Sequence, residues 1–241
     1  MKYKVLAVVA LGLLIQTTAV SANTIDITMI AGTGIQDDGW TAATSQNGIQ
    51  LGLRARYAYV GGVLANDGNG TYTTTPGFAP APHGSQAKWN YDMSVSNPSG
   101  LGSATYYISV DTDGGVAYNP LTFLVAAYGD NSYGTAATPN GGGIEGSFLL
   151  HVFDTVMQNS QNITFFPQSL YGLDPSVPGT YGFELFAVPF GAGPDATRLA
   201  SVGMTVQVGD GRVPDHTTTG TLLAGSMLGL VYLSRKTKQL A

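Results

Sequence analysis

The chain of 241 residues has a formal net charge of −5 and contains no cysteine, which excludes a disulfide framework and thiol chemistry. All 15 acidic residues lie between Asp26 and Asp215, where only five basic residues stand, so this part is strongly negative and unsuited to binding nucleic acid or an anionic membrane surface. Glycine, threonine, serine and asparagine are plentiful while Glu and Lys are rare, a composition that favours strands and turns over helices.

The N-terminus has the pattern of a secretory signal peptide. Lys2 and Lys4 precede an apolar run, and Val20-Ser21-Ala22 fits the small-residue cleavage pattern of such signals. We therefore expect residues 1–22 to form a signal helix that is removed during export, so that the mature chain begins at Asn23.

The central part, residues 23–211, is expected to form one all-β domain, an antiparallel β-sandwich or jelly roll. Apolar and polar residues alternate in a series of short runs separated by clusters of Gly, Asn, Asp and Pro, which is typical of strands joined by turns. The expected strands cover residues 23–30, 48–60, 71–75, 88–96, 103–111, 121–127, 162–166, 181–190 and 199–208.

Three of these segments carry more specific expectations. The run 88–96 alternates most cleanly, and 103–111 is its expected hairpin partner. Residues 121–127 are almost continuously apolar, which predicts a central strand covered on both faces. The strands at 181–190 and 199–208 are expected to close the fold as a hairpin.

Two connecting segments are predicted to lie outside the strands. Residues 31–47 are interpreted as a loop, in which Trp40 is expected to be exposed beside two aspartates. Residues 144–158 are ambiguous, because their apolar positions fit helical spacing, and a short helix is plausible there.

The aromatic residues of the strands have two possible roles. Trp89, Tyr91, Tyr106, Tyr107 and Tyr57 could form a platform on which sugar rings stack, which would make the domain a carbohydrate-binding module. Alternation instead favours the core, because Trp89 and Tyr91 share their face with other apolar residues. We accordingly expect six strand residues to be mostly buried: Trp89, Tyr91, Tyr106, Ile108, Phe183 and Leu185.

No catalytic constellation stands out in the sequence. The three histidines are scattered, without partners at zinc-site spacing, and neither a nucleophile elbow nor a phosphate-binding loop is present. Glu145 and Glu184 stand in no recognisable motif, and Glu184 alternates with inward residues, so it is expected to face solvent. We therefore expect a protein that is not an enzyme.

Acidic turns are the weak candidates for a cofactor, which would be calcium. Asp67, and Asp111 with Asp113, place oxygen ligands close together beside glycines, and calcium takes several such ligands from flexible loops. The alternative is that these residues only form hairpin turns. We expect millimolar calcium to give at most a modest stabilisation.

The C-terminal residues 212–241 have three successive parts. Val213-Pro214-Asp215 is followed by an uncharged apolar run at 221–233 and then by the basic residues Arg235, Lys236 and Lys238. The apolar run is close to the length of a membrane-spanning helix, and the basic cluster would hold its end on the cytoplasmic side. The alternative is a buried C-terminal core helix.

This three-part tail resembles the C-terminal sorting signals of PEP-CTERM proteins, in the variant whose motif begins Val-Pro-Asp; His216 and Thr217 stand where that variant continues with Ser or Gly. The interior is also similar to a recurring PEP-CTERM ectodomain type, on residues 47–56, 67–72, 89–91, 137–141 and 158–162. The resemblance implies recognition by an exosortase, a membrane-embedded transpeptidase that would remove the tail. It further implies transient anchoring in the inner membrane and release to the cell envelope, cell surface or exopolysaccharide matrix.

Overall fold

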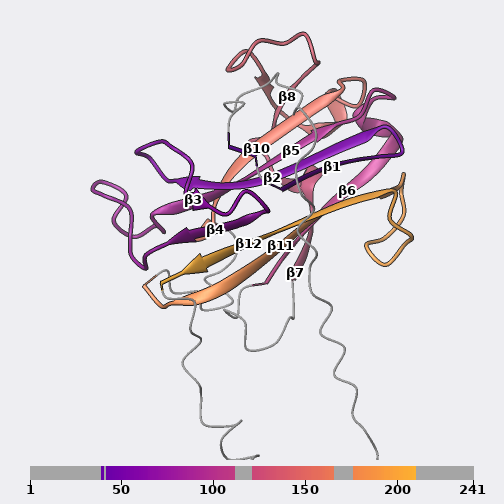
Figure 1. Ribbon diagram of the computed structural model, residues 1–241. Helices are drawn as coiled ribbons and strands as arrows, with labels where there is room; N and C mark the ends of the chain where they lie inside the picture. Colours follow the sequence, from indigo (N-terminus) through magenta and orange to yellow (C-terminus); the bar gives the residue numbers. More distant parts are fainter. Residues whose placement is uncertain (1–38, 41, 112–120, 166–175, 210–241) are drawn as a thin grey trace, which may run out of the picture.

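The computed structural model describes residues 39–40, 42–111, 121–165 and 176–209, and these form two six-stranded β-sheets (Figure 1). The first sheet has the spatial order β1 (Ala42–Gln46), β2 (Ile49–Tyr57), β5 (Trp89–Ser96), β10 (Val156–Asn162), β8 (Ser132–Gly134) and β9 (Ile144–Glu145). The second has the order β3 (Ala65–Asn66), β4 (Thr71–Thr74), β12 (Ala200–Val208), β11 (Gly179–Pro189), β6 (Ala104–Val110) and β7 (Leu121–Leu124).

Helical structure within the described residues is limited to short 3-10 turns: η1 (Leu101–Ser103), η2 (Val125–Ala127) and η3 (Phe148–Leu150). The expected all-β fold is therefore confirmed. No described helix has the length and apolar character needed to cross a membrane. The signal segment, the strand expected at 23–30 and the C-terminal apolar run lie outside the described residues.

The two sheets share one hydrophobic core, to which each contributes alternate residues of its strands. Tyr91 of the first sheet meets Phe183 of the second with ring centroids 4.9 Å apart, and Trp89 meets the same ring edge-on at 6.1 Å. The six residues predicted to be buried are all at most 2% exposed: Trp89, Tyr91, Tyr106, Ile108, Phe183 and Leu185. The period-two interpretation of their strands is thus confirmed.

A tight hairpin at Asn47-Gly48 adds a strand that we did not expect. Both residues have positive φ, 52° and 79°, as the central positions of a two-residue type I′ turn require. The turn pairs Gln46 with Ile49 and folds β1 back along β2. The loop interpretation of 31–47 is therefore wrong for Ala42–Gln46.

The strand at 103–111 does not pair with 88–96 as predicted. After β5 the chain turns at Asn97–Gly100, passes through η1 and crosses to the second sheet, where β6 pairs with β11 and β7. Burial of Leu101 at this crossing explains the change of sheet, because the connection is anchored in the core rather than in a tight turn. The predicted closing hairpin, β11 with β12, is confirmed.

The expectation of purely antiparallel sheets needs one correction. β4 runs parallel to β12, with Thr71 beside Thr205 and Thr74 beside Val208. All the other strand pairs of the described residues are antiparallel. Consequently β12, the last strand described, lies inside the second sheet with a neighbour on each side.

Three further boundaries differ from the predictions. Residues 121–127 do not form a central strand: β7 is short and lies at the edge of the second sheet. The short helix suggested at 144–158 is present only as the three-residue η3, after which a turn follows and residues 152, 154 and 155 accept backbone bonds from the 97–102 connection. The strand expected at 162–166 runs instead from Val156 to Asn162.

Candidate functional site

The predicted sorting residues cannot be placed. Val213, Pro214 and Asp215, the basic residues Arg235, Lys236 and Lys238, and the calcium candidate Asp113 all lie outside the described residues. The last described residue is Gly209, whose backbone N–H donates to the carbonyl of Thr74 at 2.7 Å.

Asp67, the first calcium candidate, is exposed, and its side chain accepts hydrogen bonds from the backbone of the turn in which it stands. One carboxylate oxygen accepts the backbone N–H groups of Asn69 at 2.7 Å and Thr71 at 3.0 Å. These bonds, that from Asn69 foremost, lower the pKa of Asp67 below its ordinary value of 3.8. The carboxylate is therefore already engaged in closing the β3–β4 turn.

Asp111 is buried at the end of β6, where its backbone N–H bonds to Gly182 of β11. β11 and β12 separate β6 from β4, so Asp111 lies roughly 14 Å or more from the Asp67 turn at ordinary strand spacing. The two candidates therefore cannot share one ion. Among the described residues no three His, Asp or Glu side chains form a metal-binding group.

Replacing Asp67 with alanine tests which role this residue has. Because the turn loses its two bonds, we expect the melting temperature to fall by roughly 2–4 °C, equally with calcium and with a chelator. The difference in melting temperature between the unchanged protein and the variant should persist at neutral pH. It should disappear in acid, as the pH falls through the lowered pKa of Asp67. A calcium-dependent rise in melting temperature that only the unchanged protein shows would instead identify Asp67 as a calcium ligand.

The strand aromatics that could have formed a sugar-binding platform belong mostly to the core, and Tyr57 packs against its edge. Trp89, Tyr91 and Tyr106 are at most 2% exposed, and burial raises the pKa of Tyr106 to about 12. Tyr107 is only partly exposed and stacks on Phe186, with ring centroids 5.6 Å apart. These rings are part of the packing and do not offer a surface on which sugars could stack.

Trp40 is 6% exposed, so the expectation that it faces solvent is wrong. Its ring covers the guanidinium of Arg54, whose central carbon lies 4.6 Å from the ring centroid. A cation over an aromatic face is attracted to it, and this contact explains why a Trp within a polar stretch is buried.

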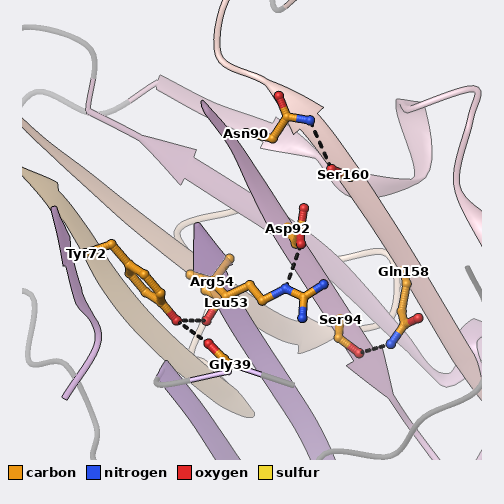
Figure 2. Close-up of polar contacts among 9 residues, drawn as sticks. All are labelled: Gly39, Leu53, Arg54, Tyr72, Asn90, Asp92, Ser94, Gln158 and Ser160. Carbon is orange, nitrogen blue, oxygen red and sulfur yellow. Dashed lines mark hydrogen bonds and ion pairs between the residues drawn. The ribbon is translucent and has the colours of Figure 1, made fainter. Parts of the chain in front are cut away.

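Arg54 belongs to a polar face of the first sheet, on the side opposite the core, that is almost entirely buried (Figure 2). Its Nε donates to Asp92 Oδ2 at 2.7 Å across the β2–β5 pair, and the two side chains are 1% and 0% exposed. Alternation predicted this face correctly as polar, but not its burial. An ion pair removed from water in this way costs desolvation energy that the pairing must offset.

Asp92 is the least satisfied member of this face. In the described part of the chain its second oxygen, Oδ1, is buried without a hydrogen-bond partner. Burial raises the pKa of Asp92, and the charge of Arg54 opposes that rise. Arg54 is therefore the strongest of the groups that stabilise this carboxylate.

The remaining polar side chains of this face bond to one another across the strands. Gln158 donates to Ser94 at 3.1 Å, and Asn90 donates to Ser160 at 3.2 Å, both between β5 and β10 (Figure 2). The amide of Asn162 donates to the carbonyl of Ala87 at 2.7 Å. These side-chain hydrogen bonds can form only when β5 and β10 pair in this register. The polar face therefore favours the observed strand register over shifted ones.

A second polar group ties the β7–β8 connection to β10. Asp130 accepts bonds from Asn159 at 2.9 Å and Gln161 at 3.0 Å, and Asn131 donates to the carbonyl of Val125 at 2.9 Å. Asn159 and Gln161 lie on the same face of their sheet as Tyr91 and Met93. These bonds hold a long connection in place, and they account for polar residues at core-facing positions of β10.

Among the described residues, one exposed apolar surface with pockets lies at the end of the molecule where β6 begins and β11 ends. Two adjacent pockets of about 370 Å³ and 380 Å³ share Phe190 as a wall. The larger is lined by Ser99, Gly102, Ser103, Val152, Phe153 and Phe190, and the other by Ala104, Thr105, Tyr106, Leu124, Ala126, Ser147, Phe148, Leu149 and Phe190. None of these residues is charged.

Five large apolar side chains around these pockets are exposed, and we call them the apolar end surface: Leu124, Leu149, Leu150, Phe153 and Phe190. Phe153 is 91% exposed, and Leu149 and Leu150 are each 80% exposed. Scattered apolar residues are normal on protein surfaces, whereas an uncharged cluster of this kind marks an interaction site.

The loop that carries most of this surface is held in place by bonds. Leu101 and Gly102 donate backbone N–H bonds to the carbonyls of Asp154 and Val152, each at 2.8 Å. His151 Nδ1 lies 2.6 Å from Asp154 Oδ2, and its ring stacks on Tyr133 with centroids 4.4 Å apart. The exposed side chains therefore project from a fixed backbone.

The sequence pattern does not predict this surface. The helical spacing at 144–158 involves Phe148, Val152, Thr155 and Val156, and it gives no expectation for Leu149, Leu150 or Phe153. Comparison with protein-family models and with curated proteins found no match for this chain. The candidate site is thus defined by the residues themselves: an exposed apolar surface at one end of a polar, strongly acidic domain.

Proposed function

We propose that this protein is a non-enzymatic component of the bacterial cell envelope or extracellular matrix, exported and sorted through its C-terminal signal. An exosortase-type transpeptidase would recognise Val213-Pro214-Asp215, and the run at 221–233 would hold the chain in the inner membrane as a helix until cleavage. The mature protein would then be a jelly-roll-like sandwich at the cell surface or in the exopolysaccharide.

The observation that carries this proposal is the order of motif, apolar run and basic cluster at the end of the chain. The fold agrees with it, because β12 ends at Val208 and the motif follows shortly afterwards. A signal-like N-terminus and a cysteine-free, acidic domain suit an exported surface protein.

Mass spectrometry of the protein isolated from its native host tests the proposal. We expect an N-terminus at Asn23 and a C-terminus close to Pro214, without the apolar run, because both terminal segments are removed during sorting. The matched control is the same protein from cells without the transpeptidase, which should keep residues 221–241. A mature protein that retains its basic C-terminus in normal cells would contradict the proposal.

The carbohydrate-binding alternative has lost its main support. It relied on aromatic side chains of a sheet face or of a loop, and Trp89, Tyr91 and Tyr106 are buried between the sheets, while Trp40 is 6% exposed. A matrix protein that interacts through its surfaces remains the function that the residues support best.

A further inference from the structure

We propose that the apolar end surface is a self-association site, at which a second copy of this chain docks about a two-fold axis. In this arrangement Phe153 of each copy inserts into the pocket beside Phe190 of the other. A two-fold contact uses the same patch on both copies, so that patch must carry both a projecting group and a recess that receives it.

The apolar end surface has both features. Phe153 projects with 91% of its surface exposed. Beside it, on the other side of Phe190, lies the pocket of about 370 Å³ lined by Leu124, Phe148 and Leu149. An aromatic ring is the kind of side chain that fills such apolar pockets at the centre of protein interfaces.

The size of the surface matches what a stable pair needs. Its five side chains expose on the order of 700 Å², because a fully exposed Leu or Phe contributes roughly 200 Å². A standard protein interface buries about 800 Å² from each partner, and the largest apolar patch of an ordinary monomer is about 300–600 Å². The apolar end surface would therefore be nearly covered by one further copy.

The charge distribution favours association of two copies through the apolar end surface. The domain is strongly negative overall, so most relative orientations of two copies are repulsive. The residues lining the two pockets are uncharged, and the carboxylate of Asp154 in the adjoining loop is paired with His151. The fixed loop backbone also favours association, because docking does not lose the conformational entropy of a mobile segment.

The absence of cysteine permits a direct test in cells that express the full-length chain. The single variant Leu150→Cys places a thiol on the apolar end surface. The variant Ser85→Cys places one on an exposed loop before the first residue of β5, whereas the last residue of β5 leads toward the apolar end surface. With a short bis-maleimide cross-linker we expect the Leu150→Cys chain to be recovered mainly as a dimer. The amount of cross-linked dimer from the Ser85→Cys chain should be at least tenfold lower.

A second substitution shows whether the apolar contact causes the cross-link. Phe190→Asp in the Leu150→Cys chain should reduce the dimer at least tenfold, whereas Phe78→Asp, at a residue 48% exposed outside the surface, should leave it unchanged. Unchanged melting temperatures would show that both variants fold. The proposal is overturned if Leu150→Cys yields no dimer, if it is linked to a different protein instead, or if Ser85→Cys yields as much dimer.

Discussion

Replacing Asp92 with alanine is expected to lower the free energy of unfolding by about 3–5 kcal/mol, the usual cost of removing one member of a buried ion pair. Arg54 is 1% exposed and would keep its charge beneath Trp40 after its bond to Asp92 is lost. For a domain of this size the loss corresponds to a fall in melting temperature of roughly 6–20 °C. Thermal unfolding followed by circular dichroism measures it.

The double variant Arg54→Met with Asp92→Leu should recover most of this loss, because apolar residues of similar volume avoid the desolvation cost altogether. The matched control is the exposed pair of Arg198 with Glu184, 2.8 Å apart, at which Glu184→Ala should cost less than about 1 kcal/mol. If Asp92→Ala proved as mild as Glu184→Ala, the buried pair would contribute nothing beyond an ordinary surface pair.

Replacing Pro214 and Asp215 together with alanine is expected to abolish processing while leaving export and anchoring intact. Pro214 fixes its own φ and keeps the residue before it extended, which is the form of chain that a transpeptidase binds. Immunoblots of membrane fractions should therefore show accumulated full-length protein in place of the shorter mature form.

Replacing Leu223 and Leu228 with aspartate is the control for anchoring. Each charge at mid-membrane costs roughly 2.5–3.5 kcal/mol on the insertion scale, so this variant should be released without being processed. Normal trimming of the Pro214/Asp215 variant would show that the motif is not the recognition element, and the tail would then be a plain membrane anchor.

Local periodicity was sufficient to predict the strands that became the core. Trp89 and Tyr91 on β5, and Phe183 on β11, were placed on the inward face because alternation depends only on neighbours in the sequence. Pairing between distant strands was not predicted, because it depends on where connections are buried. Leu101 takes β6 to the opposite sheet, and nothing in the alternation of residues 103–111 indicates that choice.

Errors at the surface had a different cause. Trp40 is expected to face solvent because it stands in a polar stretch, and only its contact with Arg54, which is itself buried with Asp92, explains its burial. The ambiguous segment 144–158, whose spacing fits a short helix, forms only the three-residue η3, because the backbone that follows is bonded to a neighbouring connection. Asn47-Gly48 is the one missed feature that the sequence did signal, through a dipeptide typical of type I′ turns.

The parallel pairing of β4 with β12 has a mechanical consequence. In a chain held at its C-terminal end, any load reaches the domain through Gly209 and acts along β12. That strand is hydrogen-bonded to β4 on one side and to β11 on the other, and these bonds lie across the direction of the pull. Under such a load the hydrogen bonds would have to break at the same time in shear, rather than one after another as when a strand is peeled from its end. A chain attached by its C-terminal end would thus pull on a strand inside the sheet, which suits it to bearing tension.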